Sequence, residues 1–135
     1  VVLTGGQLNR FAGVAPERVV AFRWSGGAWQ QVPVQVDQRK VVPFGSAPSS
    51  NTTPGKAGTV YGNGSGGPAT TQYADPNTWV GADSNPNVDA DDEVVFMASD
   101  AGTAAPAGTG APAGVVASSG TQVAVSDPRA ASERR

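Results

Sequence analysis

The sequence predicts an all-β protein: an antiparallel β-sandwich, Greek-key-like, with long loops rich in Gly, Pro and Ser. Short runs in which apolar and polar residues alternate are the first observation, because this period is typical of half-buried strands. Turn residues separate the runs, with 18 Gly and 11 Pro in 135 residues. No stretch has the apolar spacing of a long helix. Many short strands joined by Gly and Pro turns are typical of sandwiches and partly open barrels.

Seven segments carry strand patterns. They lie at residues 1–4, 19–24, 29–37, 39–44, 93–99, 114–117 and 121–126. The second segment places Val20, Phe22 and Trp24 on one face. A loop with two glycines follows it at residues 25–28, which predicts a hairpin to the third segment. A short helical turn is expected at residues 7–11.

The third segment alternates most cleanly. Val32, Val34 and Val36 face one way, while Gln35 and other polar residues face the other. Pro33 interrupts this pattern. Because proline has no N–H to donate to a neighbouring strand, we expect a sheet edge or a bulge there.

The chain is expected to form one domain over residues 1–128, with a polar insert at 45–73 and a C-terminal tail or linker at 129–135. A short strand at 59–61 is expected within the insert. The insert also carries two Asn-x-Ser/Thr patterns, at Asn51 and Asn63, which predict glycosylation if the protein passes through a eukaryotic secretory pathway. The alternative is a plain solvated loop.

Composition excludes several classes of function. The chain has no His and no Cys, so it cannot build a Ser-His-Asp site, a Cys-His site or a disulfide from its own residues. The net charge of −2 argues against nucleic-acid partners and anionic membrane surfaces, which favour basic patches. No apolar run is long enough to predict a membrane span. The first residues also lack the basic start of a signal peptide.

The acidic segment, residues 83–93, is the only place where the sequence suggests specific chemistry. Oxygen-bearing side chains recur at every second position, and the candidate ligands are Asp83, Asn85, Asn87, Asp89, Asp91, Asp92 and Glu93. Calcium takes six to eight oxygen ligands, so the pattern predicts a calcium site. The alternative is a series of turns in which Asn and Asp side chains bond to their own backbone. We expect an ion because a crowd of carboxylates without a counter-ion repels itself.

Aromatic residues offer a second candidate site. Trp24, Trp29 and Trp79 are expected either to stack on a sugar or to stabilise the sheet, and Trp24 and Trp29 flank one hairpin loop. A cross-strand pair is the more common role for such residues. Tyr61 and Tyr73 could join the platform.

Paired carboxylates are the remaining candidates for catalysis. Asp89 with Asp91, or Asp37 with Asp100, could hydrolyse a glycoside if they faced each other across a cleft. A solvated or metal-bound role suits them better, and the sequence predicts no enzyme activity within this chain.

Two segments together resemble a known kind of module. Residues 29–37 read W-x-x-V-P-V-Q-V-D, and residues 89–96 read D-x-D-D-E-V-V-F and lead to a D-x-G ending at residue 102. The pair resembles an uncharacterised β-rich module near the N-terminus of large secreted or surface-exposed microbial proteins. That resemblance implies an extracellular location and a β-sandwich, and it supplies no catalytic residues.

The function that the sequence favours is a non-catalytic, extracellular structural or assembly module of a surface protein or filament. Calcium on the acidic segment and glycan on the insert would stabilise it. Low-complexity segments need contacts to become ordered. We therefore expect other copies of the chain, or further domains of the same protein, as partners. The alternative is a carbohydrate-binding or accessory module of a secreted polysaccharide-active enzyme.

Overall fold

The computed structural model describes residues 1–43 and 68–126. Within them the strands are β1 (Val2–Thr4), β2 (Ala21–Ser25), β3 (Ala28–Val32), β4 (Gln35–Asp37), β5 (Arg39–Pro43), β6 (Ala69–Tyr73) and β7 (Glu93–Val95). Single turns of 3-10 helix are η1 (Asn9–Phe11), η2 (Pro16–Arg18), η4 (Ala98–Asp100) and η5 (Ala117–Ser119). Every strand pair is antiparallel, which confirms the all-β prediction.

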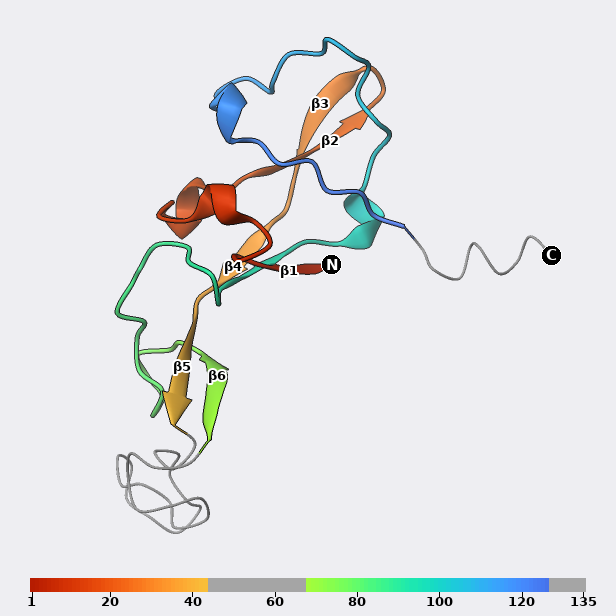
Figure 1. Cartoon of the computed structure of the whole chain (residues 1–135). Coiled ribbons are helices and arrows are strands. Elements are labelled where there is room, and N and C mark those ends of the chain that lie inside the picture. Colours follow the sequence, from red (N-terminus) through yellow and green to blue (C-terminus); the bar gives the residue numbers. More distant parts are fainter. Residues whose placement is uncertain (44–67, 127–135) are drawn as a thin grey trace, which may run out of the picture.

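Residues 28–43, the spine, pass through the molecule and pair with three partners in turn (Figure 1). β3 pairs with β2, β4 pairs with β7, and β5 pairs with β6. β7 lies at the centre of a three-stranded sheet in the order β1-β7-β4. The three small sheets therefore lie one after another along the spine (Figure 1).

Pro33 separates two sheets. The prediction of a single strand at 29–37 is wrong, because β3 ends at Val32 and β4 begins at Gln35. Proline cannot donate to a ladder, so the chain leaves one sheet here and enters the next. The alternation of burial continues through the break: Val34 is half-buried while Pro33 is exposed.

The C-terminal part of the described chain differs most from prediction. β7 is shorter than the strand expected at 93–99, and η4 occupies its end. Residues 114–117 and 121–126 form no strand, so those two predictions are wrong. The surrounding sequence is rich in Ala, Gly and Pro, which have low strand preference. An isolated bridge between Trp24 and Thr103 joins the residues just after η4 to β2.

A small hydrophobic core lies beneath the three-stranded sheet. It contains Leu8, Val19, Val88 and Val94, and its partly buried neighbours are Leu3, Phe11, Val14, Val34 and Val36. Val42 is buried separately on β5. The core thus brings the N-terminal turn, the acidic segment and β7 together.

The polar insert ends in a strand, because β6 occupies residues 69–73 of the span expected to be loop. The predicted strand at 59–61, the sequons at Asn51 and Asn63, and the expected tail at 129–135 lie outside the described residues. None of the helices in the described ranges has the length and apolar character to cross a bilayer.

Candidate functional site

The N-terminal turn holds the acidic segment through its backbone. The bonds run from Gly5 N to Asp92 O (2.8 Å), Gly6 N to Ala90 O (3.0 Å), Gly13 N to Val88 O (2.8 Å) and Val88 N to Val14 O (2.9 Å). A Cβ placed on Gly5 would lie 1.7 Å from the carbonyl oxygen of Asp89. Only glycine permits this approach.

Asx turns account for the two-residue period of the acidic segment. Asp83 Oδ1 accepts a hydrogen bond from Asn85 N (3.2 Å), and Asn85 Oδ1 accepts one from Asn87 N (3.2 Å). Asp89 Oδ1 accepts one from Asp91 N (3.3 Å). Each side chain thus caps the amide two positions later, as Asn and Asp commonly do. The structure therefore contains the alternative arrangement, in which Asn and Asp side chains bond to their own backbone.

Asp92 is fully buried, with an exposed fraction of 0%. Its Oδ1 accepts a hydrogen bond from the backbone N of Arg39 (2.8 Å), and its Oδ2 accepts one from the backbone N of Asp89 (2.9 Å). One carboxylate therefore joins the spine to the acidic segment. A buried carboxylate is tolerated because charge-assisted bonds of this kind compensate for lost hydration.

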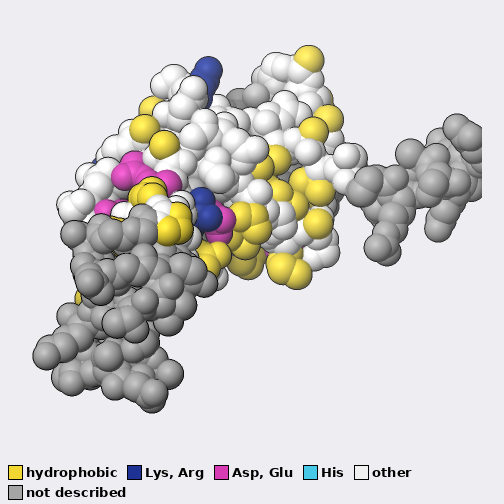
Figure 2. Space-filling model, turned by 60° about the horizontal axis from the view of Figure 1, so that its bottom comes forward, with side chains coloured by type: hydrophobic (Ala, Val, Ile, Leu, Met, Phe, Trp, Pro, Cys, Tyr) yellow, Lys and Arg dark blue, Asp and Glu magenta, His cyan; other side chains and the backbone are white. Residues whose placement is uncertain are grey.

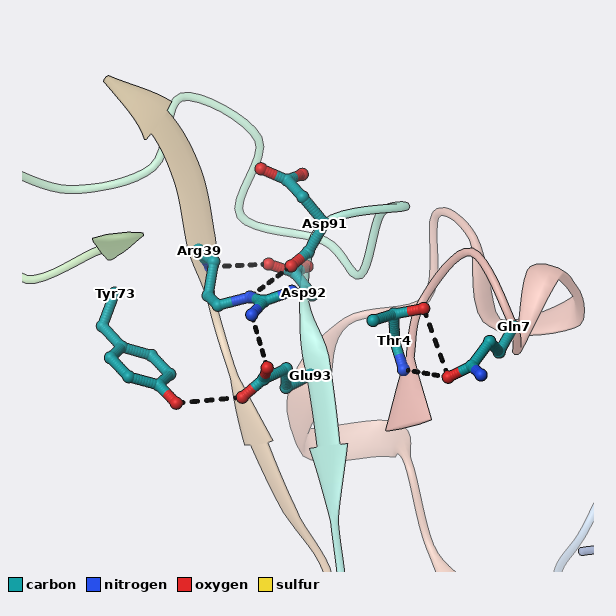
Figure 3. A network of polar contacts seen from close by, with 7 residues as sticks. All are labelled: Thr4, Gln7, Arg39, Tyr73, Asp91, Asp92 and Glu93. Carbon is teal, nitrogen blue, oxygen red and sulfur yellow. Dashed lines mark hydrogen bonds and ion pairs between the residues drawn. The ribbon is translucent and has the colours of Figure 1, made fainter. Parts of the chain in front are cut away.

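Arg39 is the counter-ion that the sequence analysis did not identify (Figure 3). Its Nε donates to the carbonyl oxygen of Asp91 (2.5 Å), and its Nη1 pairs with Glu93 Oε1. Glu93 Oε2 accepts a hydrogen bond from the hydroxyl of Tyr73 (3.0 Å). Arg39 thus neutralises part of the negative charge for which the sequence suggested an added ion. We call Arg39, Asp92, Glu93 and Tyr73 the clamp.

Asp89 and Asp91 influence each other's ionisation. A hydrogen bond between their side chains, with burial and the charge of Asp89, raises the pKa of Asp91 to about 6. The same hydrogen bond lowers the pKa of Asp89, and Asn85 Nδ2 also donates to Asp89 Oδ2 (3.0 Å). Two carboxyl groups in hydrogen-bond contact are closer than the separation of about 5 Å or more that glycoside hydrolysis requires.

Stability should depend on pH through this pair. Because the folded-state pKa of Asp91 lies above its unfolded value, its stabilising contribution is complete below the unfolded pKa and is lost as pH rises through about 6. Asparagine at position 91 cannot ionise. We therefore expect Asp91→Asn to have a higher unfolding temperature than the wild type at about pH 8, and we expect this difference to disappear below about pH 4. Thermal unfolding followed across pH measures this. Asp100→Asn is the control, and a gap independent of pH would contradict the assignment.

The predicted calcium ligands do not converge into one set of carboxylates. Across residues 1–43 and 68–126, no three Asp or Glu side chains gather at metal-binding range. Asp92 and Glu93 are engaged in the clamp. Asp83 Oδ2 is buried without a hydrogen-bond partner in the described part of the chain.

The tryptophans divide between two environments. Trp24 and Trp29 face each other across the β2-β3 hairpin, with ring centroids 5.3 Å apart and an interplanar angle of 80°. Trp29 Nε1 also donates to the carbonyl oxygen of Gly110 (2.7 Å). This edge-to-face pair stabilises the hairpin. Trp79 lies in the loop after β6 with 38% of its surface exposed.

Sequence reasoning missed Arg39, Gly5 and the hydrogen bond of Tyr73 to Glu93. Arg39 is the first residue of the strand predicted at 39–44, and a cation on a strand was an available signal in a chain with only 15% charged residues. The Gly5-Gly6 pair was read as loop, although adjacent glycines next to a strand often mark a close backbone approach.

Comparison with known proteins found no matching family model, no similar curated protein and no similar solved structure. The site must therefore be interpreted from its own geometry.

Proposed function

We propose that this chain is a non-catalytic extracellular structural module that assembles with copies of itself or with further domains of the same protein. The observation that carries the proposal is the balance between a small core and a large apolar surface. Among the described residues, the buried hydrophobic side chains are Leu8, Val19, Val42, Val88 and Val94. Four of these are valine, which buries little area per residue.

Exposed hydrophobic side chains are large and numerous by comparison. Val2 on β1 is 55% exposed, Met97 is 65% exposed and Val116 is 69% exposed. Hydrophobic side chains gather at the surface of the face in Figure 2. Contiguous exposed apolar surface is typical of contact sites. This supports a module that completes its packing against a partner.

The sandwich predicted from the sequence belongs to the same proposal. Strands that leave one sheet and enter another at a bend form the corners of β-sandwiches and barrels. The passage of the spine through Pro33 from β3 to β4 is a bend of this kind. A partner covering the open faces of the small sheets would supply the second layer.

Extracellular or cell-surface location and glycan on Asn51 and Asn63 are further parts of the proposal. They rest on the sequons, the resemblance of residues 29–37 and 89–96, and the composition. Mass spectrometry of peptides from the native protein tests the glycan directly. Unmodified asparagine at both positions would remove it.

Analytical ultracentrifugation of the purified chain tests self-assembly. We expect sedimentation to increase with protein concentration, and we expect Val2→Lys or Met97→Lys to reduce this increase because each places a charge on the exposed apolar surface. Glu17→Lys is the matched control, since Glu17 is already exposed and polar. Identical sedimentation of all variants as monomers would contradict assembly through this surface.

Calcium remains part of the proposal, supported by the raised pKa of Asp91 beside Asp89 and by the oxygen of Asp83 that has no hydrogen-bond partner among the described residues. A bound cation would replace the proton on Asp91, so binding and protonation compete. We expect calcium to raise the unfolding temperature at about pH 8 and much less at about pH 5. The Asp91→Asn variant should respond weakly. An equal response to calcium in wild type and Asp91→Asn would contradict a site on the acidic segment.

A further inference from the structure

We propose that an open depression beside Tyr73 binds a pyranose ring of a neutral saccharide. The depression forms where β4 passes into β5 and where β6 ends, and it has a volume of about 610 Å³. Its lining includes Tyr73, Gln35, Asp37, Gln38 and Asp75. The inference is independent of whether the chain assembles.

Tyr73 provides the stacking surface. Its side chain is 60% exposed, yet its hydroxyl donates to Glu93 Oε2 (3.0 Å), and Glu93 is itself paired with Arg39. Figure 3 shows the hydroxyl of Tyr73 pointing toward Glu93. The hydrogen bond fixes an aromatic ring that would otherwise move freely, so less entropy is lost when a ligand binds to it. The weakly polar C–H face of a pyranose packs well on such a ring.

Two carboxylates, Asp37 and Asp75, line the depression together with Tyr73. Asp37 Oδ1 accepts from Gln35 Nε2 (2.5 Å), and Asp75 Oδ1 accepts from Asn77 N (2.8 Å). In the described part of the chain, Oδ2 of each carboxylate has no protein donor. Ionised carboxylates accept hydrogen bonds only, and sugar hydroxyls are donors that match them.

The charge of the depression selects a neutral sugar. Asp37 and Asp75 both line it, and Glu93 accepts the hydrogen bond of the Tyr73 hydroxyl. Like charges in contact cost affinity, so a uronate or sulfated sugar should be rejected. The site also differs from the platform predicted on the tryptophans, because Trp24 and Trp29 pack on each other.

Nuclear magnetic resonance of the full chain with labelled tyrosine tests the proposal. The protein has two tyrosines, so Tyr61 serves as an internal control, and a Tyr61→Phe variant assigns the signals. We expect cellohexaose, mannohexaose or maltohexaose to shift the Tyr73 signal at millimolar concentration. Oligogalacturonate, an acidic hexasaccharide, should leave that signal unchanged.

Two substitutions separate stacking from folding. Tyr73→Ala should weaken binding of the neutral hexasaccharide by at least about tenfold. Tyr73→Phe keeps the ring and loses the hydrogen bond that fixes it, so it should bind more weakly than the wild type and more tightly than Tyr73→Ala. Trp79→Ala changes an exposed aromatic outside the depression and should bind as the wild type does. The proposal is overturned if none of the three neutral sugars shifts Tyr73, or if Tyr73→Ala binds as well as wild type.

Discussion

Replacing Asp92 with alanine is expected to lower the free energy of unfolding by about 2 to 5 kcal/mol. The carboxylate is buried and accepts from the backbone N of Arg39 (2.8 Å) and of Asp89 (2.9 Å). Alanine leaves both donors without a partner, and each buried unsatisfied donor costs about 1 to 3 kcal/mol. Small domains have only about 5 to 15 kcal/mol of stability in total, so this loss is large.

Urea denaturation followed by tryptophan fluorescence measures the effect. Asp92→Asn keeps one acceptor oxygen and places an amide NH2 against the other donor, so its cost should be close to that of alanine and not close to wild type. Asp100→Ala is the matched control, because Asp100 is a half-buried aspartate outside the clamp. If Asp92→Ala and Asp100→Ala lose the same stability, Asp92 does not join the spine to the acidic segment.

Gly5→Ala should cost about 2 to 4 kcal/mol, because the added methyl group collides with backbone. The new Cβ would lie 1.7 Å from Asp89 O, and a carbonyl oxygen cannot turn away as a flexible side chain can. Relief of the collision requires residues 5 and 89 to separate. That movement lengthens the bond from Gly5 N to Asp92 O, which is 2.8 Å in the structure.

Gly6 supplies the comparison for this substitution. A Cβ on Gly6 would lie 3.4 Å from Ala90 O, which is near ordinary contact. Neither glycine has a positive φ, so any difference between the two variants reflects the collision and not backbone strain. We expect Gly6→Ala to change stability by less than about 1 kcal/mol. Thermal unfolding of the two variants side by side checks this, and equal losses would contradict the close approach at Gly5.

Periodicity predicted the strands whose side chains face a core on one side. The alternation around Val32, Val34 and Val36 is present in the structure, although Pro33 divides the segment between two sheets. The two-glycine loop correctly predicted the hairpin of β2 and β3. The strands expected at 114–117 and 121–126 did not form, because valine spacing in an Ala- and Gly-rich segment says nothing about whether a partner strand is available.

The acidic segment shows why one period can support two interpretations. A calcium loop and a series of Asx turns both place an oxygen-bearing side chain at every second residue. Which of them forms depends on distant residues. The backbone N of Arg39 donates a hydrogen bond to the Asp92 carboxylate, and the guanidinium of Arg39 forms an ion pair with Glu93. Contacts across more than 50 positions leave no local pattern, so the clamp was not predictable from the segment itself.

The surroundings of Tyr73 were likewise not predictable from the local sequence. Its exposure and its fixed hydroxyl both depend on the register in which Arg39 lies opposite Tyr73 on β5 and β6. The sequence placed this residue within a polar insert and gave no sign of a strand there. The candidate sugar site is therefore a product of the fold.

Electron microscopy of the native, unfractionated protein tests the central claim of assembly most directly. A structural module with a small core and exposed Val2, Met97 and Val116 should be found in regular filaments or in ordered arrays at a cell surface. Dispersed single particles in that material would contradict the account, and they would leave the saccharide site beside Tyr73 as the better guide to what the chain does.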